Sequence, residues 1–185
     1  MTARMRAACG ALFLALAALG AHATDAPIAA RGTLQAAFAP WDDIEELVTD
    51  TIGSARRQVL VQAYLLTSKT IASTLVAAHR RGVEVRVLLD AEQLVKAASS
   101  MAPELADAGI PVWLETRYQN AHNKIIVIDA GTPEAAVITG SFNFTWTAQH
   151  RNAENILIVR NNPELAARYA ANWERHRQDA TPYKK

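Results

Sequence analysis

The chain has few of the residues on which many catalytic sites and scaffolds depend. It contains one cysteine, Cys9, and aromatic residues make up only 6% of its 185 residues. Because Cys9 lies within an N-terminal apolar run, the part of the chain after that run has no cysteine. That part can therefore form neither an internal disulfide, nor a thiolate nucleophile, nor a cysteine-ligated metal site.

Long hydrophobic runs are also lacking. The apolar stretch from Ala7 to Leu19 is shorter than the roughly 20 residues that span a bilayer. It follows two arginines and precedes Ala21-His22-Ala23, which predicts a signal peptide over residues 1–23 with cleavage near Ala23. We therefore expect a periplasmic or secreted protein without stable membrane insertion, and a retained N-terminal anchor is the alternative.

The chain also lacks an excess of positive charge. The chain carries 19 basic and 18 acidic side chains, and removal of residues 1–23 would leave 17 basic against 18 acidic. This balance excludes a protein that coats nucleic acid through bulk charge. Any affinity for phosphate must therefore come from a local site.

Strand and helix patterns alternate along the chain and predict an α/β protein. After a lead-in over residues 24–32, one domain is expected over residues 33–185, since the length suffices for one core. The alternation favours a mixed, mostly parallel sheet with helices on both faces. Strands are predicted at 33–38, 58–65, 83–90, 112–114, 124–129, 135–139 and 155–160, and helices at 42–55, 68–81, 92–108 and 163–176.

Several residues predict where the helices begin and end. Asp42 or Asp43 is suited to cap the first helix, and Asn162 the last. Gly82 follows the second helix, where glycine is favoured. Pro103 is expected to break the third helix or to start a second piece.

The most informative stretch runs from His122 to Asp129, and a second polar segment follows eleven residues later. Residues two apart on a strand point to the same face, so His122 and Lys124 share a face about 7 Å apart. Asp129 ends the strand on the opposite face. The second segment adds the hydroxyl of Ser141 and the carboxamide of Asn143. Together these groups suit the handling of a phosphodiester.

These two segments resemble the signature of the phospholipase D superfamily, H-x-K-x4-D followed by G-S-x-N. Residues 152–155 are similar to the downstream acidic position of the family, and the resemblance extends over about residues 33–170. The gap between Asp129 and Gly140 is a few residues longer than usual, which affects the turn and leaves both segments intact. In size and layout the chain is most similar to small secreted nucleases that carry one such motif and dimerise.

The resemblance implies a role for each polar residue. His122 would attack phosphorus and form a phosphohistidine, while Lys124, Ser141 and Asn143 would bind the nonbridging oxygens. Glu154 would accept a hydrogen bond from the other ring nitrogen of His122. No metal or cofactor is implied, because Lys124 supplies the positive charge.

Asp129 completes the motif and is counted among the catalytic-site residues. Its position on the face opposite His122 nevertheless favours support of the local structure over a part in the chemistry.

A single copy of the motif does not complete a phosphodiesterase, because the leaving oxygen also needs a general acid. A symmetric homodimer would supply it, with His122 of the two subunits meeting across a twofold axis. We therefore expect a phosphodiester hydrolase, and most of all a metal-independent, nonspecific endonuclease acting on DNA or RNA. The alternatives are a phospholipase D acting on phosphatidyl head groups and a noncatalytic phosphate-binding module.

Residues next to the motif leave two interpretations open. Trp146 would either pack at the seam of the dimer or stack on a base. His150 and Arg151 would either contact the substrate or lie in a solvated loop.

Overall fold

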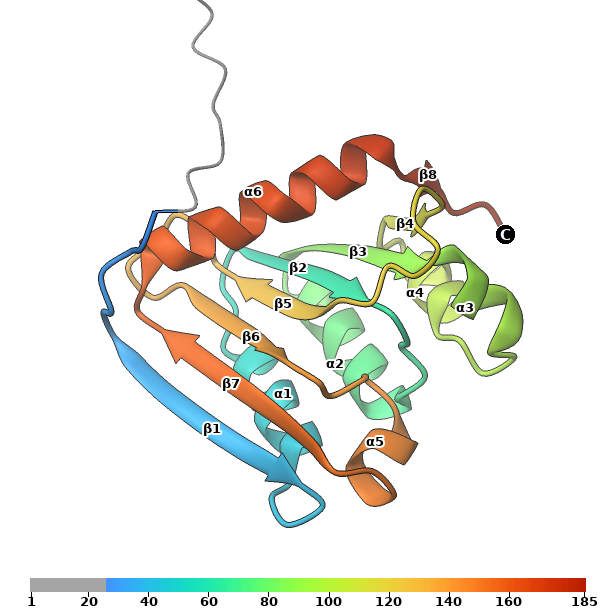
Figure 1. Ribbon diagram of the computed structural model, residues 1–185. Helices are drawn as coiled ribbons and strands as arrows, with labels where there is room; N and C mark the ends of the chain where they lie inside the picture. The colour runs from blue at the N-terminus through green and yellow to red at the C-terminus, as the bar shows by residue number, and fades with distance from the viewer. Residues whose placement is uncertain (1–25) are drawn as a thin grey trace, which may run out of the picture.

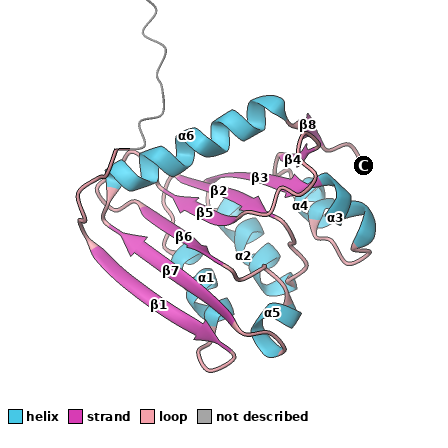
Figure 2. Ribbon diagram, viewed as in Figure 1, coloured by secondary structure: helices cyan, strands magenta, loops and turns pink. Residues whose placement is uncertain are grey.

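The computed structural model describes residues 26–185, in which eight strands form one sheet with helices on both faces (Figure 1, Figure 2). The predicted signal peptide lies outside the described residues. The strands are β1 (Thr33–Ala39), β2 (Gln58–Ala63), β3 (Glu84–Asp90), β4 (Val112–Glu115), β5 (Lys124–Ile128), β6 (Ala136–Gly140), β7 (Glu154–Arg160) and β8 (Thr181–Pro182). The helices are α1 (Ile44–Gly53), α2 (Lys69–Arg80), α3 (Ala91–Lys96), α4 (Ala102–Asp107), α5 (Trp146–His150) and α6 (Pro163–Asp179).

The strand order is β1-β7-β6-β5-β2-β3-β4-β8, and most neighbouring strands run antiparallel. Only β2 with β3 and β3 with β4 pair in parallel, whereas the other five pairs are antiparallel. The α/β class and the mixed sheet are confirmed, but the prediction of a mostly parallel sheet was wrong. Helical crossovers place β2, β3 and β4 side by side, while β5, β6 and β7 follow one another closely in the chain and lie between β1 and β2.

Each face of the sheet packs against its own helices. On one face, α1 and α2 contribute Ile44, Val48, Ile52, Ile71 and Leu75 to a large buried cluster. On the other face, α6 crosses the sheet and places Ala166 and Trp173 against Leu60, Leu88, Val127 and Val137 (Figure 2). The indole nitrogen of Trp173 donates to the carbonyl of Val61 at 2.8 Å, which fixes α6 to β2.

Local capping residues set the helix ends largely as expected. Asp43, Ser68 and Asn162 each accept a backbone N–H from the first turn of α1, α2 and α6. Gly82 follows α2 with φ of +90°, a conformation that favours glycine. Pro103 stands in the first turn of α4, so the predicted third helix is indeed two pieces. The short elements α5 and β8 were not predicted.

One end of the sheet, which we call the motif edge, carries both polar segments. Here β5 begins at Lys124, opposite Ala63 at the end of β2, and β6 ends at Gly140 beside the start of β7. The strands β1, β3 and β4 also end at this edge. Figure 1 shows β1 and β2 pointing toward it and β5 and β7 pointing away. None of the helices in the described range is long and apolar enough to cross a membrane.

Candidate active site

His122 and Lys124 lie together at the start of β5. The Nζ atom of Lys124 lies 2.9 Å from Nδ1 of His122 and donates to its carbonyl oxygen at 2.8 Å. Only 6% of Lys124 is exposed, and this burial lowers the pKa of its ammonium below the ordinary value, while the charge of Glu154 acts in the opposite direction. The structure therefore brings the predicted nucleophile and cation into direct contact.

Tyr64 completes this pair and was not predicted. Its ring centroid lies 4.3 Å from that of His122, and the Lys124 ammonium lies 4.9 Å from the same tyrosine ring. The backbone N–H of Tyr64 donates to the carbonyl of Asn123 at 2.7 Å, which continues the pairing of β2 with β5. The sole signal in the sequence was a tyrosine at the end of a predicted strand, because the pairing that brings it to His122 is long-range.

The second segment is held against the start of β7. The hydroxyl of Ser141 donates to Glu154 at 2.5 Å and accepts from the backbone N–H of Asn155 at 3.1 Å. The other oxygen of Glu154 accepts from the amide of Asn152 at 2.8 Å. A Cβ atom on Gly140 would lie 2.2 Å from the carbonyl oxygen of Asn155, so only glycine allows this close approach.

One predicted hydrogen bond therefore differs from the structure. Within the described residues, Glu154 bonds to Ser141 and Asn152 and forms no hydrogen bond with His122, whose Nδ1 instead faces Lys124. The single hydroxyl proton of Ser141 is directed to Glu154, so its donation to a phosphate oxygen, which stays a prediction, would require this hydroxyl to rotate. Glu154 acts on the site through its charge on Lys124.

Asn143 lies beside the loop that follows β2. Its neighbour Phe144 donates its N–H to the carbonyl of Leu65 and accepts from the N–H groups of Thr67 and Ser68. The buried Oδ1 atom of Asn143 has no hydrogen-bond partner among the described residues. The backbone next to Asn143 is thus held by hydrogen bonds, while the Oδ1 atom of its side chain forms none with the described residues.

Asp129 lies at the far end of β5, roughly 20 Å along the chain direction from His122. Its carboxylate accepts three backbone N–H groups, from Arg56 at 2.9 Å, Arg57 at 2.7 Å and Gln58 at 2.8 Å. Asp129 has a left-handed backbone with φ of +49°. The structure therefore does not bring Asp129 to the other motif residues, and its contacts join the end of β5 to the start of β2.

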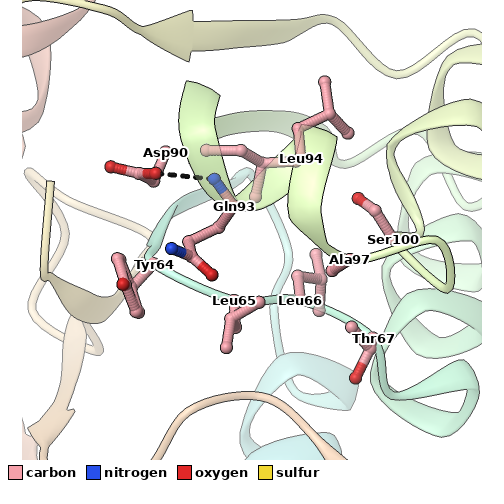
Figure 3. Close-up of a pocket in the computed structure, with 10 residues that line it drawn as sticks. Tyr64, Leu65, Leu66, Thr67, Asp90, Gln93, Leu94, Ala97 and Ser100 are labelled. Carbon is pink, nitrogen blue, oxygen red and sulfur yellow. Dashed lines mark hydrogen bonds between the residues drawn. The ribbon is translucent and has the colours of Figure 1, made fainter. Parts of the chain in front are cut away.

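A narrow crevice adjoins the site on the other side of Tyr64. It is lined by residues that follow β2 and β3, among them Leu65, Asp90 and Gln93 (Figure 3). Its volume of about 10 Å³ admits little more than one water molecule. The fully buried Asp90 accepts from the N–H groups of Gln93 and Ala121, both at 2.8 Å, and so anchors the loop that carries His122.

The sequence of the chain matches a known family over this whole arrangement. Residues 48–177, which include both polar segments, match the family described as "Cardiolipin synthase, PLD-like domain". The chain belongs to the phospholipase D superfamily. It is accordingly a phosphodiesterase of that superfamily, which agrees with the histidine and lysine at the motif edge.

Relatives within the phospholipase D superfamily carry lipid names. A "Phospholipase D" of Rickettsia bellii is 38% identical over 143 residues, which are 77% of this chain and 68% of the relative. A "Mitochondrial cardiolipin hydrolase" of Xenopus laevis is 33% identical over 128 residues, which are 69% of this chain and 58% of the relative.

Solved structures of the superfamily share the fold. The phospholipase D family member Nuc from Salmonella typhimurium superposes with a TM-score of 0.76 at 31% identity, over 83% of this chain and 99% of Nuc. NucT from Helicobacter pylori gives a TM-score of 0.71 at 20% identity, over 82% of this chain and all of NucT. At 20% identity, the likeness to NucT supports the fold alone.

The site offers charge and hydrogen-bond donors but no ready metal cage. Within residues 26–185, no three histidine, cysteine or carboxylate side chains come together in a way that would hold a metal ion. The groups that can bind a phosphodiester at the motif edge are the Lys124 ammonium, the His122 imidazole and the Asn143 amide.

Proposed function

We propose that the protein is a nonspecific endonuclease that hydrolyses DNA or RNA through a phosphohistidine on His122, without a metal ion, after export and removal of residues 1–23. The observation that carries the choice of a polymer is the exposure of His122 and Ser141 at the motif edge. The crevice beside Tyr64 measures only about 10 Å³. Four larger pockets, of 190 to 380 Å³, lie elsewhere on the fold, and no motif residue lines them.

An open edge suits a chain that enters and leaves on both sides of the scissile phosphate. A lipid phosphodiester would instead benefit from an apolar cavity for its acyl chains, and the crevice beside the site has no room for one. The phosphates of nucleic acid need only local positive charge, which Lys124 provides.

In the proposed reaction, neutral His122 attacks phosphorus through Nε2, forming a P–N bond as the bond to the leaving oxygen breaks. Lys124 turns from His122 to a nonbridging oxygen, and the amide of Asn143 donates to the same group. Nδ1 of His122 must then carry a proton. In this proposal the carboxylate of Glu154, which contacts Ser141 and Asn152 in the structure, accepts a hydrogen bond from Nδ1 once Lys124 has turned away. Water finally attacks phosphorus, the P–N bond breaks, and His122 is restored.

The leaving oxygen needs a proton that this chain does not supply from a second copy of the motif. We propose that His122 of a second subunit donates it across a twofold axis and later accepts a proton from the attacking water. The mechanism therefore requires a homodimer with both motif edges facing each other.

The relatives named phospholipase D and cardiolipin hydrolase support a second candidate, hydrolysis of phosphatidyl groups. The two candidates share His122, Lys124 and Asn143 and differ in substrate.

A parallel assay tests both candidates. Purified protein lacking residues 1–23 is incubated in excess chelator with plasmid DNA, with RNA, and with vesicles of phosphatidylcholine or cardiolipin. The expected result is that DNA is nicked while the lipids stay intact. Lipid turnover without nicking would instead favour the phospholipase function over the nuclease function. His122→Ala should abolish nicking, whereas His79→Ala, on α2, should not. Nicking that stops on chelation would overturn the metal-free mechanism. A fully active monomer in sedimentation would overturn the dimeric mechanism.

A further inference from the structure

Exposed aromatic side chains gather at the motif edge. Within residues 26–185, four aromatic residues are exposed: Phe38 (51%), Trp41 (83%), Tyr118 (44%) and Trp146 (56%). Each lies in or after a strand that finishes at the motif edge. Phe38 stands near the end of β1 and Trp41 two residues after it, Tyr118 lies three residues after β4, and Trp146 begins α5, six residues after β6. The other seven aromatic residues of this range are buried or half-buried.

These four residues flank the candidate nucleophile on both sides. In the sheet, β5 carries the His122–Lys124 pair and lies between β6, β7 and β1 on one side and β2, β3 and β4 on the other. At a strand spacing of about 4.8 Å, the edge from β1 to β4 is roughly 30 Å long. The strand order therefore places the aromatic residues along an extended edge with the His122–Lys124 pair near its middle.

The aromatic ring of Trp146 already contacts one cation and one imidazole. The Arg151 guanidinium lies 5.7 Å from its ring centroid, and the His150 ring centroid lies 4.6 Å away. The short helix beneath it is rigidly held, because the amide of Gln149 donates to the carbonyl of Asp42 and accepts from the N–H of Glu45. Trp146 is thus fixed in place, three residues after Asn143, with a positive charge beside it.

We propose that Phe38, Trp41, Tyr118 and Trp146 form a stacking surface for the unpaired bases of single-stranded nucleic acid, on either side of the phosphate at His122. This inference rests on the proposed nuclease function and narrows its substrate. Aromatic platforms next to local cations bind single strands without sequence preference, because every base has a stacking face. Duplex bases are already stacked on each other and cannot use such a surface.

Membrane docking fits the same surface less well. Trp41 is followed by Asp42 and Asp43, whose carboxylates would enter the bilayer interface together with the indole ring. Tyr118 adjoins an ion pair between Arg117 and Asp179. Burial of these charges in a bilayer interface would be costly, whereas a solvated single strand leaves them in water.

The test separates base stacking from phosphate binding in the inactive His122→Ala background. Binding is measured by fluorescence anisotropy with an oligothymidylate and with an abasic oligonucleotide of equal length, in chelator. The oligothymidylate should bind more tightly, and adding Trp146→Ala should weaken it by about fivefold to a hundredfold while leaving the abasic strand unchanged. Leu34→Ala is the matched control, because Leu34 is 68% exposed at the opposite end of β1.

The outcomes distinguish this inference from the proposed function. Two results together support the nuclease and the stacking surface. The unmutated protein cleaves the oligothymidylate and the abasic oligonucleotide, and Trp146→Ala raises KM for the oligothymidylate only. If both oligonucleotides are cleaved and Trp146→Ala changes neither KM, the nuclease function stands and the stacking surface is overturned. Absence of any cleavage overturns the nuclease itself. A stacking role is also overturned if Trp146→Ala dissociates the dimer in sedimentation, or if it abolishes binding to anionic vesicles that the unmutated protein shows.

Discussion

The Nζ atom of Lys124 lies 2.9 Å from Nδ1 of His122, so the cation of the site contacts the ring of the proposed nucleophile. If the Lys124 ammonium donates to Nδ1, a neutral imidazole at His122 carries its own proton on Nε2. Nε2 is the nitrogen that must be unprotonated to attack phosphorus. Binding of a phosphate, which draws Lys124 away, would therefore release the nucleophile into its reactive tautomer.

The lowered pKa of Lys124 predicts an asymmetric pH dependence. Burial disfavours the ammonium form in the free protein, so kcat/KM should begin to fall at a lower pH than an ordinary lysine would cause. A bound phosphate favours the ammonium, so the basic limb of kcat should lie at higher pH. Profiles of kcat and kcat/KM on an oligonucleotide measure both limbs, and coincident limbs would contradict the argument.

Lys124→Arg is the control for this pH profile. The guanidinium stays charged throughout the accessible range, so the basic limb assigned to Lys124 should disappear even though the activity is reduced. A basic limb that persists unchanged in this variant would belong to another group.

Tyr64 should act as a positioning residue for His122 and Lys124. Tyr64→Phe keeps the ring that packs on both side chains and removes only a long contact to Asn120 at 3.4 Å, so kcat should change little. Tyr64→Leu removes the ring, and kcat should fall by about tenfold to a hundredfold with little change in KM, because misplacement of the nucleophile affects the transition state. Steady-state kinetics and trapping of the phosphohistidine check this.

A matched control for the loss of a tyrosine ring is available on α6. Tyr169→Leu removes a half-buried ring that packs against the buried cluster around Trp173, and it should leave kcat unchanged. Equal losses in the two leucine variants would point to stability, not to positioning. A drop in Tyr64→Phe as large as in Tyr64→Leu would assign the effect to the hydroxyl.

Local pattern predicted the elements, but long-range pairing determined the sheet. Strand positions followed from short apolar or alternating runs, and helix ends from caps such as Asp43 and Asn162. The direction of the strands did not follow, because β1 pairs with β7 from the other end of the chain, with Thr33 opposite Arg160. Nothing in either segment specifies that partner.

The same limit applies to the site. The spacing of His122 and Lys124 was sufficient to place them on one face, because strand periodicity is local. Tyr64 came to them only through the pairing of β2 with β5, and α5 was too short for a periodic signal. The Ser141–Glu154 hydrogen bond likewise depends on the side-chain geometry at the junction of β6 and β7, which spacing does not specify.

Asp129 should matter for stability more than for turnover. In Asp129→Asn, one carboxylate oxygen becomes an NH₂ donor, which would face a backbone N–H of Arg56 or of the Arg57–Gln58 pair. A loss of about 1–3 kcal/mol in the free energy of unfolding is expected, with kcat per folded molecule unchanged. Urea unfolding and active-site titration measure the two quantities. Glu134→Gln, which removes an exposed carboxylate nearby in the chain, is the control for charge alone.

Gly140 should be intolerant of even one added methyl group. A Cβ at this position would lie 2.2 Å from the Asn155 oxygen and 2.9 Å from the Cα of Ile156, both backbone atoms that can move only if β6 and β7 separate. Gly140→Ala should therefore destabilise the fold by about 1–3 kcal/mol and, by shifting the segment that carries Ser141 and Asn143, lower kcat by roughly a hundredfold.

Gly53 provides the matched comparison for this substitution. Its added Cβ would meet nothing within 4 Å, and it stands at the end of α1, where alanine favours the helix by up to about 1 kcal/mol. Gly53→Ala should thus raise the thermal midpoint slightly and leave kcat unchanged. If Gly140→Ala behaved in the same way, the close approach of β6 to β7 would not be what holds Ser141 and Asn143 in register with His122.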